Sequence, residues 1–442
     1  MSRRTNASLL RVLGLGFGLA VAVGNTIGGG ILRTPGDIAG WLPQPWAFLG
    51  VWVVGALYAT LGANALSELG TMLPRSGGQY IFAHHAFGDY AGFLVGWIDW
   101  ISTCASTAII ALVIGESVAS LLGADASASK PAAMAIVLAL TVLLLRSTRL
   151  GDRAQRATTL IKAIALVALV AACFAFSGRA HHPPSTPIAH LPTPIAILLA
   201  IQAVIYTYDG WSGPVYFSEE LDDPARQIPR SMFYSLASVA VIYLLINIAF
   251  VVTLPTSALA GSPLAAATVA QAIFGARGDQ IVRIVVIASL PSAVSACILM
   301  ASRVLYSVSR DGLGPSFATR VNAGGAPVLS LALTGLIAIV FIATKTVTTI
   351  VAVAAFFFVA DYTLSFAAVF VLRAREPNAA RPYRSIGHPW TTGVVLLGSL
   401  AFLASAVVAD RRNSLFALAV VVVSYPVFRL SQMRRASPAS AR

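Results

Sequence analysis

The sequence predicts an all-α membrane protein whose chain crosses a bilayer many times. Of its 442 residues, 57% are hydrophobic and only 11% are charged, and the mean hydropathy is +0.80. A soluble domain carries about a quarter of charged residues. Apolar stretches near the ~20 residues that a transmembrane helix requires recur along the whole chain. We therefore expect a single polytopic membrane domain, with two of its helices interrupted by glycine and proline.

The apolar stretches predict twelve transmembrane helices. We place them at 12–40, 45–69, 91–122, 131–146, 157–177, 194–218, 231–253, 280–309, 327–344, 347–373, 391–409 and 413–430. The third and eighth are longer than a bilayer core requires, so we expect them to tilt or to extend beyond it. The polar, basic start of the chain resembles a signal peptide. Because a long apolar run follows and no small-residue cleavage site ends it, we expect a retained first helix.

The basic residues predict that both termini are cytoplasmic. With the N-terminus inside, 20 of the 30 Lys and Arg residues fall in inner segments and eight fall in outer segments. Inner loops of membrane proteins carry the excess of Lys and Arg. The net charge of +13 is spread over short loops rather than gathered in a soluble basic domain, so we expect no nucleic-acid partner. The expected location is the inner, cytoplasmic membrane of the cell.

The sequence offers no cofactor, metal or catalytic motif. Cys104, Cys173 and Cys297 lie in separate apolar stretches, which defines neither a metal motif nor a disulfide framework. The three histidines of the loop 178–194 have no cysteine or carboxylate beside them, and solvated loop residues are the simpler interpretation. Neither HExxH nor GxSxG is present. A membrane-embedded enzyme and a channel are the alternatives of a different class, and nothing in the sequence favours either.

The first interruption is GNTIGGGI, residues 24–31, inside the first apolar stretch. Each glycine in a helix costs about 1 kcal/mol relative to alanine. Irregular backbone at membrane depth is tolerated where it lines a cavity. Close packing of helices at small residues is the other interpretation, and the glycines alone do not decide between the two.

The second interruption favours the cavity. It is YDGWSGP, residues 208–214, in the sixth predicted span. The two interrupted spans are five apart, and interrupted helices at matching positions of two halves mark the binding site of inverted-repeat transporters. We therefore expect 12–177 and 194–373 to be two five-helix repeats, with 391–430 outside them. The two halves show no sequence identity to each other, so this division rests on the positions of the two interruptions.

An interrupted helix also predicts the chemistry of its ligand. It leaves free N–H groups at one new end and free carbonyls at the other. The N–H end suits a carboxylate, and the carbonyls suit an ammonium group. A ligand that carries both groups close together is an α-amino acid. We expect Gly28, Gly29 and Gly30 to supply N–H groups, and carbonyls near Thr26 and along 206–209 to bind the ammonium group.

Five segments, in order, resemble motifs of the amino acid–polyamine–organocation transporters, most closely the L-type branch and its bacterial relatives. They are GNTIGGGILRTP (24–35), SELGTMLPRSGGQYIFAHHAFG (67–88), YTYDGWSGPVYFSEELDDPARQIPRS (206–231), SRVLYSVSRDGLGP (302–315) and REPNAARPYRSIGHP (375–389). The resemblance implies a leucine-transporter-like fold with a 5+5 inverted repeat and with helices 1 and 6 unwound at mid-membrane. It implies secondary active transport of amino acids by alternating access.

Transferred to this sequence, the resemblance assigns the substrate carboxylate to the N–H groups of Gly29 and Gly30. It assigns the ammonium group to the carbonyls of Thr26, Tyr206 and Asp209. Tyr206 matches the aromatic gate over the substrate, where other members often have phenylalanine or tryptophan. The other substrate contacts that we expect are Ile27, Tyr208, Gly210, Trp211 and Ser212.

Two ionisable residues are candidates for coupling, Lys162 and Asp209. Lys162 lies within the fifth span, where a lysine is costly unless it pairs or snorkels. The resemblance places it where sodium-coupled relatives bind the ion, which implies sodium-independent exchange or proton symport. Asp209 would attract a cation or respond to protons; its other interpretation is a cap of the interrupted helix. In the proton symport alternative, the proton is a second ligand.

Other charged residues of the spans have no partner that the sequence reveals. Asp99, Glu116 and Asp361 belong to this group. The acidic residues of 219–223 form either a latch of an inner gate or a solvated loop.

Because Ser102, Cys104 and Ser106 would make a mildly polar wall without a partner for an acidic side chain, we expect a neutral amino acid as the substrate. The alternative substrate is a cationic amino acid or a polyamine, and no accessory subunit is evident.

Overall fold

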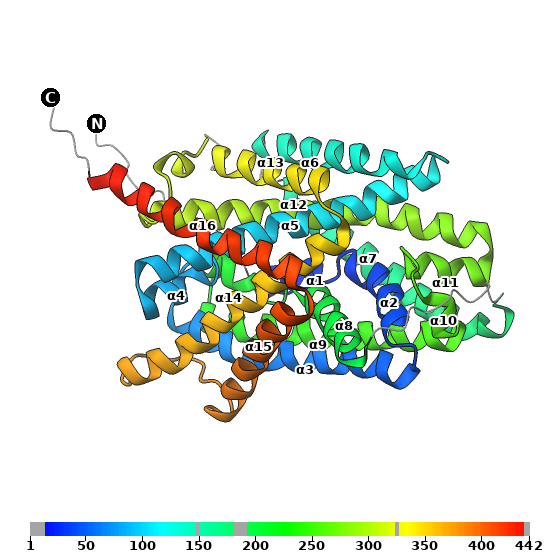
Figure 1. Cartoon of the computed structure of the whole chain (residues 1–442), viewed down its shortest axis with the longest axis horizontal. Helices are drawn as coiled ribbons and strands as arrows, with labels where there is room; N and C mark the ends of the chain where they lie inside the picture. The colour runs from blue at the N-terminus through cyan, green and yellow to red at the C-terminus, as the bar shows by residue number, and fades with distance from the viewer. Residues whose placement is uncertain (1–13, 147–149, 181–191, 323–326, 437–442) are drawn as a thin grey trace.

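The computed structural model describes residues 14–146, 150–180, 192–322 and 327–436, and Figure 1 shows their regular structure to be helical. The α-helices are α1 (Leu15–Thr26), α2 (Gly30–Trp41), α3 (Pro45–Met72), α4 (Tyr80–Phe87), α5 (Asp89–Leu121), α6 (Ser129–Arg146), α7 (Leu150–Phe176), α8 (Thr193–Tyr208), α9 (Pro224–Thr253), α10 (Thr256–Leu259), α11 (Ala265–Phe274), α12 (Ala276–Arg310), α13 (Val328–Thr344), α14 (Val347–Arg375), α15 (Trp390–Ala409) and α16 (Arg411–Ala436). The 3₁₀ helices are η1 (Ala126–Ala128), η2 (Ser177–Arg179), η3 (Gly213–Glu220) and η4 (Ser316–Thr319).

Within the described ranges, nine helical segments are long and apolar enough to cross a membrane. They cover 45–72, 89–121, 126–146, 193–220, 224–253, 276–310, 347–375, 390–409 and 411–433. The prediction of an all-α, multi-pass membrane protein is therefore confirmed. The other three predicted spans fall on the α1–α2 pair, on α7, whose apolar part is Leu160–Phe176, and on α13. The number twelve stays a prediction.

The sequence pattern missed three short helices between the predicted spans. α4 has eight residues, α10 has four and α11 has ten. None is long enough to register as a span, because a helix rises only about 1.5 Å per residue. In Figure 1, α4 lies near one end of the long axis, and α10 and α11 lie near the other.

The centre of the molecule is built on α5 and α12, which run along its length and make the most extensive contact between two helices. α6 and α13 pack together along one edge, and α3 and α9 along the opposite edge (Figure 1). In the most apolar window of α5, 78% of the residues are buried, against 17% for α16. Large apolar side chains stay exposed on α15 and α16, such as Val408 and Val422. A broad exposed apolar surface of this kind suits contact with lipid.

A buried carboxylate fixes the segment 375–389 to α3. Glu68 accepts two hydrogen bonds from Arg373, at 2.8 and 2.6 Å, and a third at 2.7 Å from the backbone N–H of Ser385. Arg381 lies 3.2 Å from the same carboxylate. The side chain of Glu68 is only 2% exposed, and removal of one partner of a buried ion pair costs roughly 3–5 kcal/mol. The carboxylate of Glu68 therefore joins α3, α14 and the segment that follows α14.

Candidate functional site

The first interruption lies between α1 and α2. α1 ends at Thr26 and α2 begins at Gly30, and the N–H of Gly28 turns back to the carbonyl of Thr26 at 2.8 Å. Gly29 and Gly30 are needed for space rather than for a left-handed backbone, since neither has a positive φ. A Cβ on Gly29 would lie 3.1 Å from Val113, and one on Gly30 would lie 3.0 Å from Thr207.

Two side chains from neighbouring helices bind the free carbonyls of this interruption. The ammonium group of Lys162, on α7, donates to the carbonyls of Gly24 at 3.1 Å and Ile27 at 3.2 Å. The hydroxyl of Tyr243, on α9, donates to the carbonyl of Thr26 at 2.6 Å. Lys162 is 4% exposed, so the snorkelling alternative does not describe this structure.

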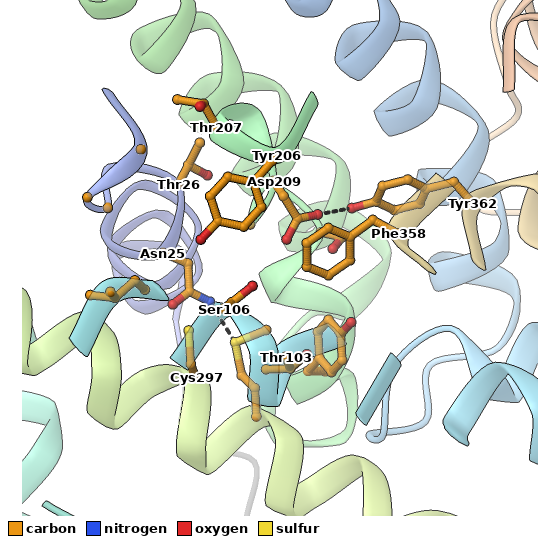
Figure 2. Close-up of a pocket in the computed structure, with 18 of the residues that line it drawn as sticks. Asn25, Thr26, Thr103, Ser106, Tyr206, Thr207, Asp209, Cys297, Phe358 and Tyr362 are labelled. Atoms are coloured by element: carbon orange, nitrogen blue, oxygen red, sulfur yellow. Dashed lines mark hydrogen bonds between the residues drawn. The ribbon is translucent and has the colours of Figure 1, made fainter. Parts of the chain in front are cut away.

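The second interruption follows α8, which ends at Tyr208. The N–H of Asp209 lies 3.1 Å from the carbonyl of Ile205 and 3.2 Å from that of Tyr206. The carboxylate of Asp209 accepts a 2.5 Å hydrogen bond from the hydroxyl of Tyr362 on α14 (Figure 2). The Trp211 ring stacks on the Tyr362 ring, with centroids 5.1 Å apart.

The two interruptions touch at Gly210. Its φ is +114°, a conformation that only glycine adopts readily. A Cβ there would lie 2.8 Å from the backbone nitrogen of Thr26. The Tyr243 hydroxyl, bonded to Thr26, lies only 3.2 Å from the carbonyl of Thr207 as well. The sequence thus brings the two interruptions into contact through one glycine and one tyrosine.

A polar cavity lies where the interruptions meet (Figure 2). Eight of the predicted site residues line it: Thr26, Gly28, Gly29, Gly30, Tyr206, Asp209, Gly210 and Ser212. Four others do not line it: Ile27, Tyr208, Trp211 and Lys162. Tyr208 packs instead against Trp52 and Tyr243, with ring centroids 6.2 and 5.1 Å away. Lys162 acts on the first interruption from outside the cavity.

Gln79, just before α4, and Tyr216, on η3, also line the cavity. Three further helices contribute to its wall, and the sequence predicted only Ser106 among their residues. They contribute Thr103, Ser106 and Ile110 from α5, Cys297 and Met300 from α12, and Phe358 and Tyr362 from α14. Within each helix these residues are three or four apart, the spacing of one helix face. That spacing is a usable signal only once it is known which face of each helix points inward. Ser102 and Cys104, expected beside Ser106, are buried away from the cavity.

Tyr206 separates this cavity from a second one. The second cavity shares Tyr206, Gly29 and Gly30 with the first and continues past Arg33 and Asp37 on α2. The hydroxyl of Tyr206 points toward Asn25 in Figure 2. Tyr206 therefore lies at the boundary of the two cavities together with Gly29 and Gly30, and its role as a gate stays a prediction.

Ion pairs join the helices that follow each interruption to the central pair. Arg33 on α2 binds Glu116 on α5 at 2.6 Å. Glu219 on η3 lies 3.4 Å from Arg310 of α12, and the neighbouring Glu220 lies 3.2 Å from Arg303. The segment 219–223 is expected to be a latch or a solvated loop. Glu219 and Glu220 are not simply solvated, because both form ion pairs with α12. Glu116, without a partner in the sequence, has one in Arg33.

Interrupted helices around a shared polar cavity, in a bundle with an apolar exterior, define the class of membrane permeases. The comparison of sequences gives the family. The profile of the amino acid permease family matches residues 8–425, so this chain belongs to the amino acid permeases. The prediction of an amino acid transporter is confirmed, and because the family consists of permeases, the enzyme alternative is wrong.

The relatives cover nearly the whole chain. The serine/threonine exchanger SteT of Bacillus subtilis is 25% identical over 97% of this chain and 98% of its own length. The Asc-type amino acid transporter 1 of Mus musculus is 27% identical over 98% of this chain and 83% of its own. The b(0,+)-type amino acid transporter 1 of the same species is 28% identical, over 85% and 79%. These relatives agree with the resemblance to the L-type branch and its bacterial relatives.

Proposed function

We propose that this permease transports neutral L-α-amino acids across the cytoplasmic membrane by alternating access, as a sodium-independent exchanger or a proton symporter. One observation carries the proposal. Two interrupted helices meet at a single cavity, which is lined by residues at the start of α2, where a helix has free N–H groups, and by residues at the end of α8, where a helix has free carbonyls. The α-amino group and the α-carboxylate, which every amino acid shares, match these two sets.

The carboxylate binds the N–H groups of Gly29 and Gly30, at the N-terminus of α2. Gly28 contributes shape only, because its N–H is bonded to Thr26. The ammonium group binds the carbonyls of Tyr206 and Asp209. Thr26, the third carbonyl that the resemblance names, already accepts from Gly28 and from Tyr243, and a carbonyl oxygen has two lone pairs.

The cavity wall supports a neutral side chain. Thr103 and Ser106 offer hydroxyl groups, and Ile110, Met300 and Phe358 offer apolar surface. A charged side chain would need a partner of opposite sign, since an unpaired charge is costly away from water. Short neutral side chains, which the name of SteT also indicates for that relative, fit this wall best.

Asp209 supports one second candidate, a cationic substrate. Asp209 lines the cavity, and the partners of its carboxylate are the Tyr362 hydroxyl and the backbone N–H of Gly210 rather than a basic side chain. In the Asp209→Asn variant, a neutral-substrate transporter keeps its preference for alanine over arginine. Selective loss of arginine uptake in this variant would replace the neutral proposal with the cationic one.

We also propose the topology of twelve spans, with both termini in the cytoplasm. Residues 12–177 and 194–373 are the two repeats, helices 1 and 6 are unwound at mid-membrane, and 391–430 lie outside the repeats. Tyr206 closes one side of the site, and the ion pairs of η3 with α12 close the other. All three cysteines are buried, which supports a transporter without a disulfide-linked subunit.

The test is uptake into liposomes that contain the purified full-length protein. Vesicles preloaded with unlabelled serine, threonine, alanine, leucine or arginine are given each labelled amino acid in turn. We expect saturable exchange of the small neutral amino acids, independent of sodium. Absence of exchange for every amino acid would overturn the proposal. Empty vesicles, and vesicles without protein, are the controls.

A further inference from the structure

Two buried carboxylates lie near the cavity without a basic partner. Asp99 on α5 is 2% exposed and Asp361 on α14 is 1% exposed. The helices that carry them, α5 and α14, pack against each other, and the charges of Asp99 and Asp209 act on Asp361. None of the ion pairs in the described part of the chain involves these three aspartates.

The hydrogen bonds of the pair are unequal. The hydroxyl of Tyr216, on η3, donates to Asp99, at 2.8 Å from one oxygen and 3.0 Å from the other. Thr103 is a weak further donor to Asp99 at 3.5 Å. Oδ1 of Asp361 is fully buried and has no hydrogen-bond partner among the described residues. A buried carboxylate oxygen without a donor is expensive, whereas a protonated carboxyl loses most of that cost.

The titratable groups whose charges act on the pair are one carboxyl, two phenols and one thiol. They are Tyr216 on η3, Asp209 at the end of α8, Tyr362 on α14 and Cys104 on α5. Two neighbouring carboxylates in a low-dielectric interior do not both ionise without a cation. The pair therefore holds a proton as a unit rather than as two independent acids.

We propose that Asp99 and Asp361 form the proton-binding site of this permease and that η3 connects this site to the substrate cavity. Tyr216 makes the connection, because it lines the cavity and also donates to Asp99. A displacement of η3 removes the donor that favours the ionised form of Asp99. The pair then binds its proton more tightly, so proton binding and the position of η3 depend on each other.

This inference rests on the proposed function, because it selects proton coupling from the two mechanisms left open there. It also separates two roles. Lys162 holds the first interruption through backbone carbonyls, and the acidic pair binds the proton beside the second. If the acid pair binds the proton, a change in the pair should alter gradient-driven accumulation, whereas Lys162 only holds the first interruption in place.

The experiment uses liposomes with and without an inward proton gradient. Wild type is expected to accumulate the substrate several-fold in empty vesicles under the gradient. Asp361→Asn is expected to keep exchange in preloaded vesicles and to lose the gradient-driven accumulation. Asp125→Asn, which changes an exposed carboxyl between α5 and α6, is the matched control and should behave as wild type.

The outcomes distinguish this inference from the proposed function. No exchange by the wild type would overturn the proposed function itself. Exchange that ignores the gradient in the wild type, or an unchanged response in Asp361→Asn, would overturn the proton site alone. If Asp361→Asn does not fold, infrared spectra of the wild type decide. A protonated carboxyl band that persists at neutral pH, where exposed carboxyls are ionised, supports the site, and its absence overturns it.

Discussion

The two interrupted helices reach the same cavity, but different parts of the molecule hold them. At the first, the donors to the backbone carbonyls of the interrupted segment, Lys162 and Tyr243, come from neighbouring helices, and its own Asn25 side chain donates to Met300 on α12. At the second, the interrupted segment supplies its own side chains. Asp209 and Trp211 both contact one tyrosine of α14, Tyr362.

This difference indicates different tasks. The first interruption depends on three hydrogen bonds from two other helices, so its shape follows the packing of α7 and α9. The second depends on one carboxylate, one ring stack and one glycine with positive φ, all of which a rotation about Gly210 would rearrange. We infer that the first is the fixed half of the site and the second is the half that moves. Four pairs of variants test this comparison.

The largest effect is expected from Lys162→Met. Two buried carbonyls lose their donor, at roughly 1–3 kcal/mol each, so exchange should fall by at least about 30-fold. The matched control is Lys130→Met, which removes an exposed lysine that donates to a single carbonyl at 3.3 Å and should leave exchange near wild type. Full exchange by Lys162→Met would mean that the first interruption does not depend on α7.

Gly210→Ala should follow. A left-handed backbone costs a residue with a side chain about 1–2 kcal/mol, and the new Cβ would lie 2.8 Å from the Thr26 nitrogen. We expect a loss of about tenfold or more in the exchange rate. Gly123→Ala is the control, because Gly123 is exposed, has a φ of +63°, and would have no neighbour within 4 Å of an added Cβ. Equal losses in both variants would contradict the special position of Gly210.

Tyr243→Phe should have an intermediate effect. It removes one hydroxyl and leaves a buried carbonyl one donor short, a change of about 1 kcal/mol in the free energy of unfolding. Tyr208→Phe is matched to it, since the Tyr208 hydroxyl is buried without a partner among the described residues. In detergent, the melting temperature of Tyr243→Phe should therefore be lower than that of Tyr208→Phe. The reverse order of melting temperatures would show that the Tyr243 hydroxyl does not stabilise the contact between the two interruptions.

The smallest effects are expected at the ion pairs beyond each interruption. Glu116→Gln weakens the pair with Arg33, and Glu219→Gln weakens the pair with Arg310. Partly exposed pairs contribute about 0.2–1 kcal/mol, so exchange should change less than about fivefold. If η3 is the mobile half, Glu219→Gln should change the exchange rate more than Glu116→Gln does. Equal changes would argue against that asymmetry.

The sequence was sufficient for the membrane class, the two interruptions and eight residues of the cavity, because glycine, proline and an aspartate are conspicuous in apolar helices. It was not sufficient for Tyr243 or Met300, since a tyrosine or a methionine in an apolar helix has no distinct signal. The partners of Asp99 and Glu116 come from elements far along the chain. Only tertiary packing brings Tyr216 and Arg33 to them.

The hydroxyl of Tyr243 has one hydrogen and two carbonyl oxygens within reach, at 2.6 and 3.2 Å. It donates to Thr26 in this structure, and a small rotation of the O–H bond would redirect it to Thr207. Without displacement of any heavier atom, that rotation changes which helix end carries a free lone pair. The free carbonyl lone pair where the two helices meet can therefore belong to either helix, and the two states differ only in the orientation of one O–H bond.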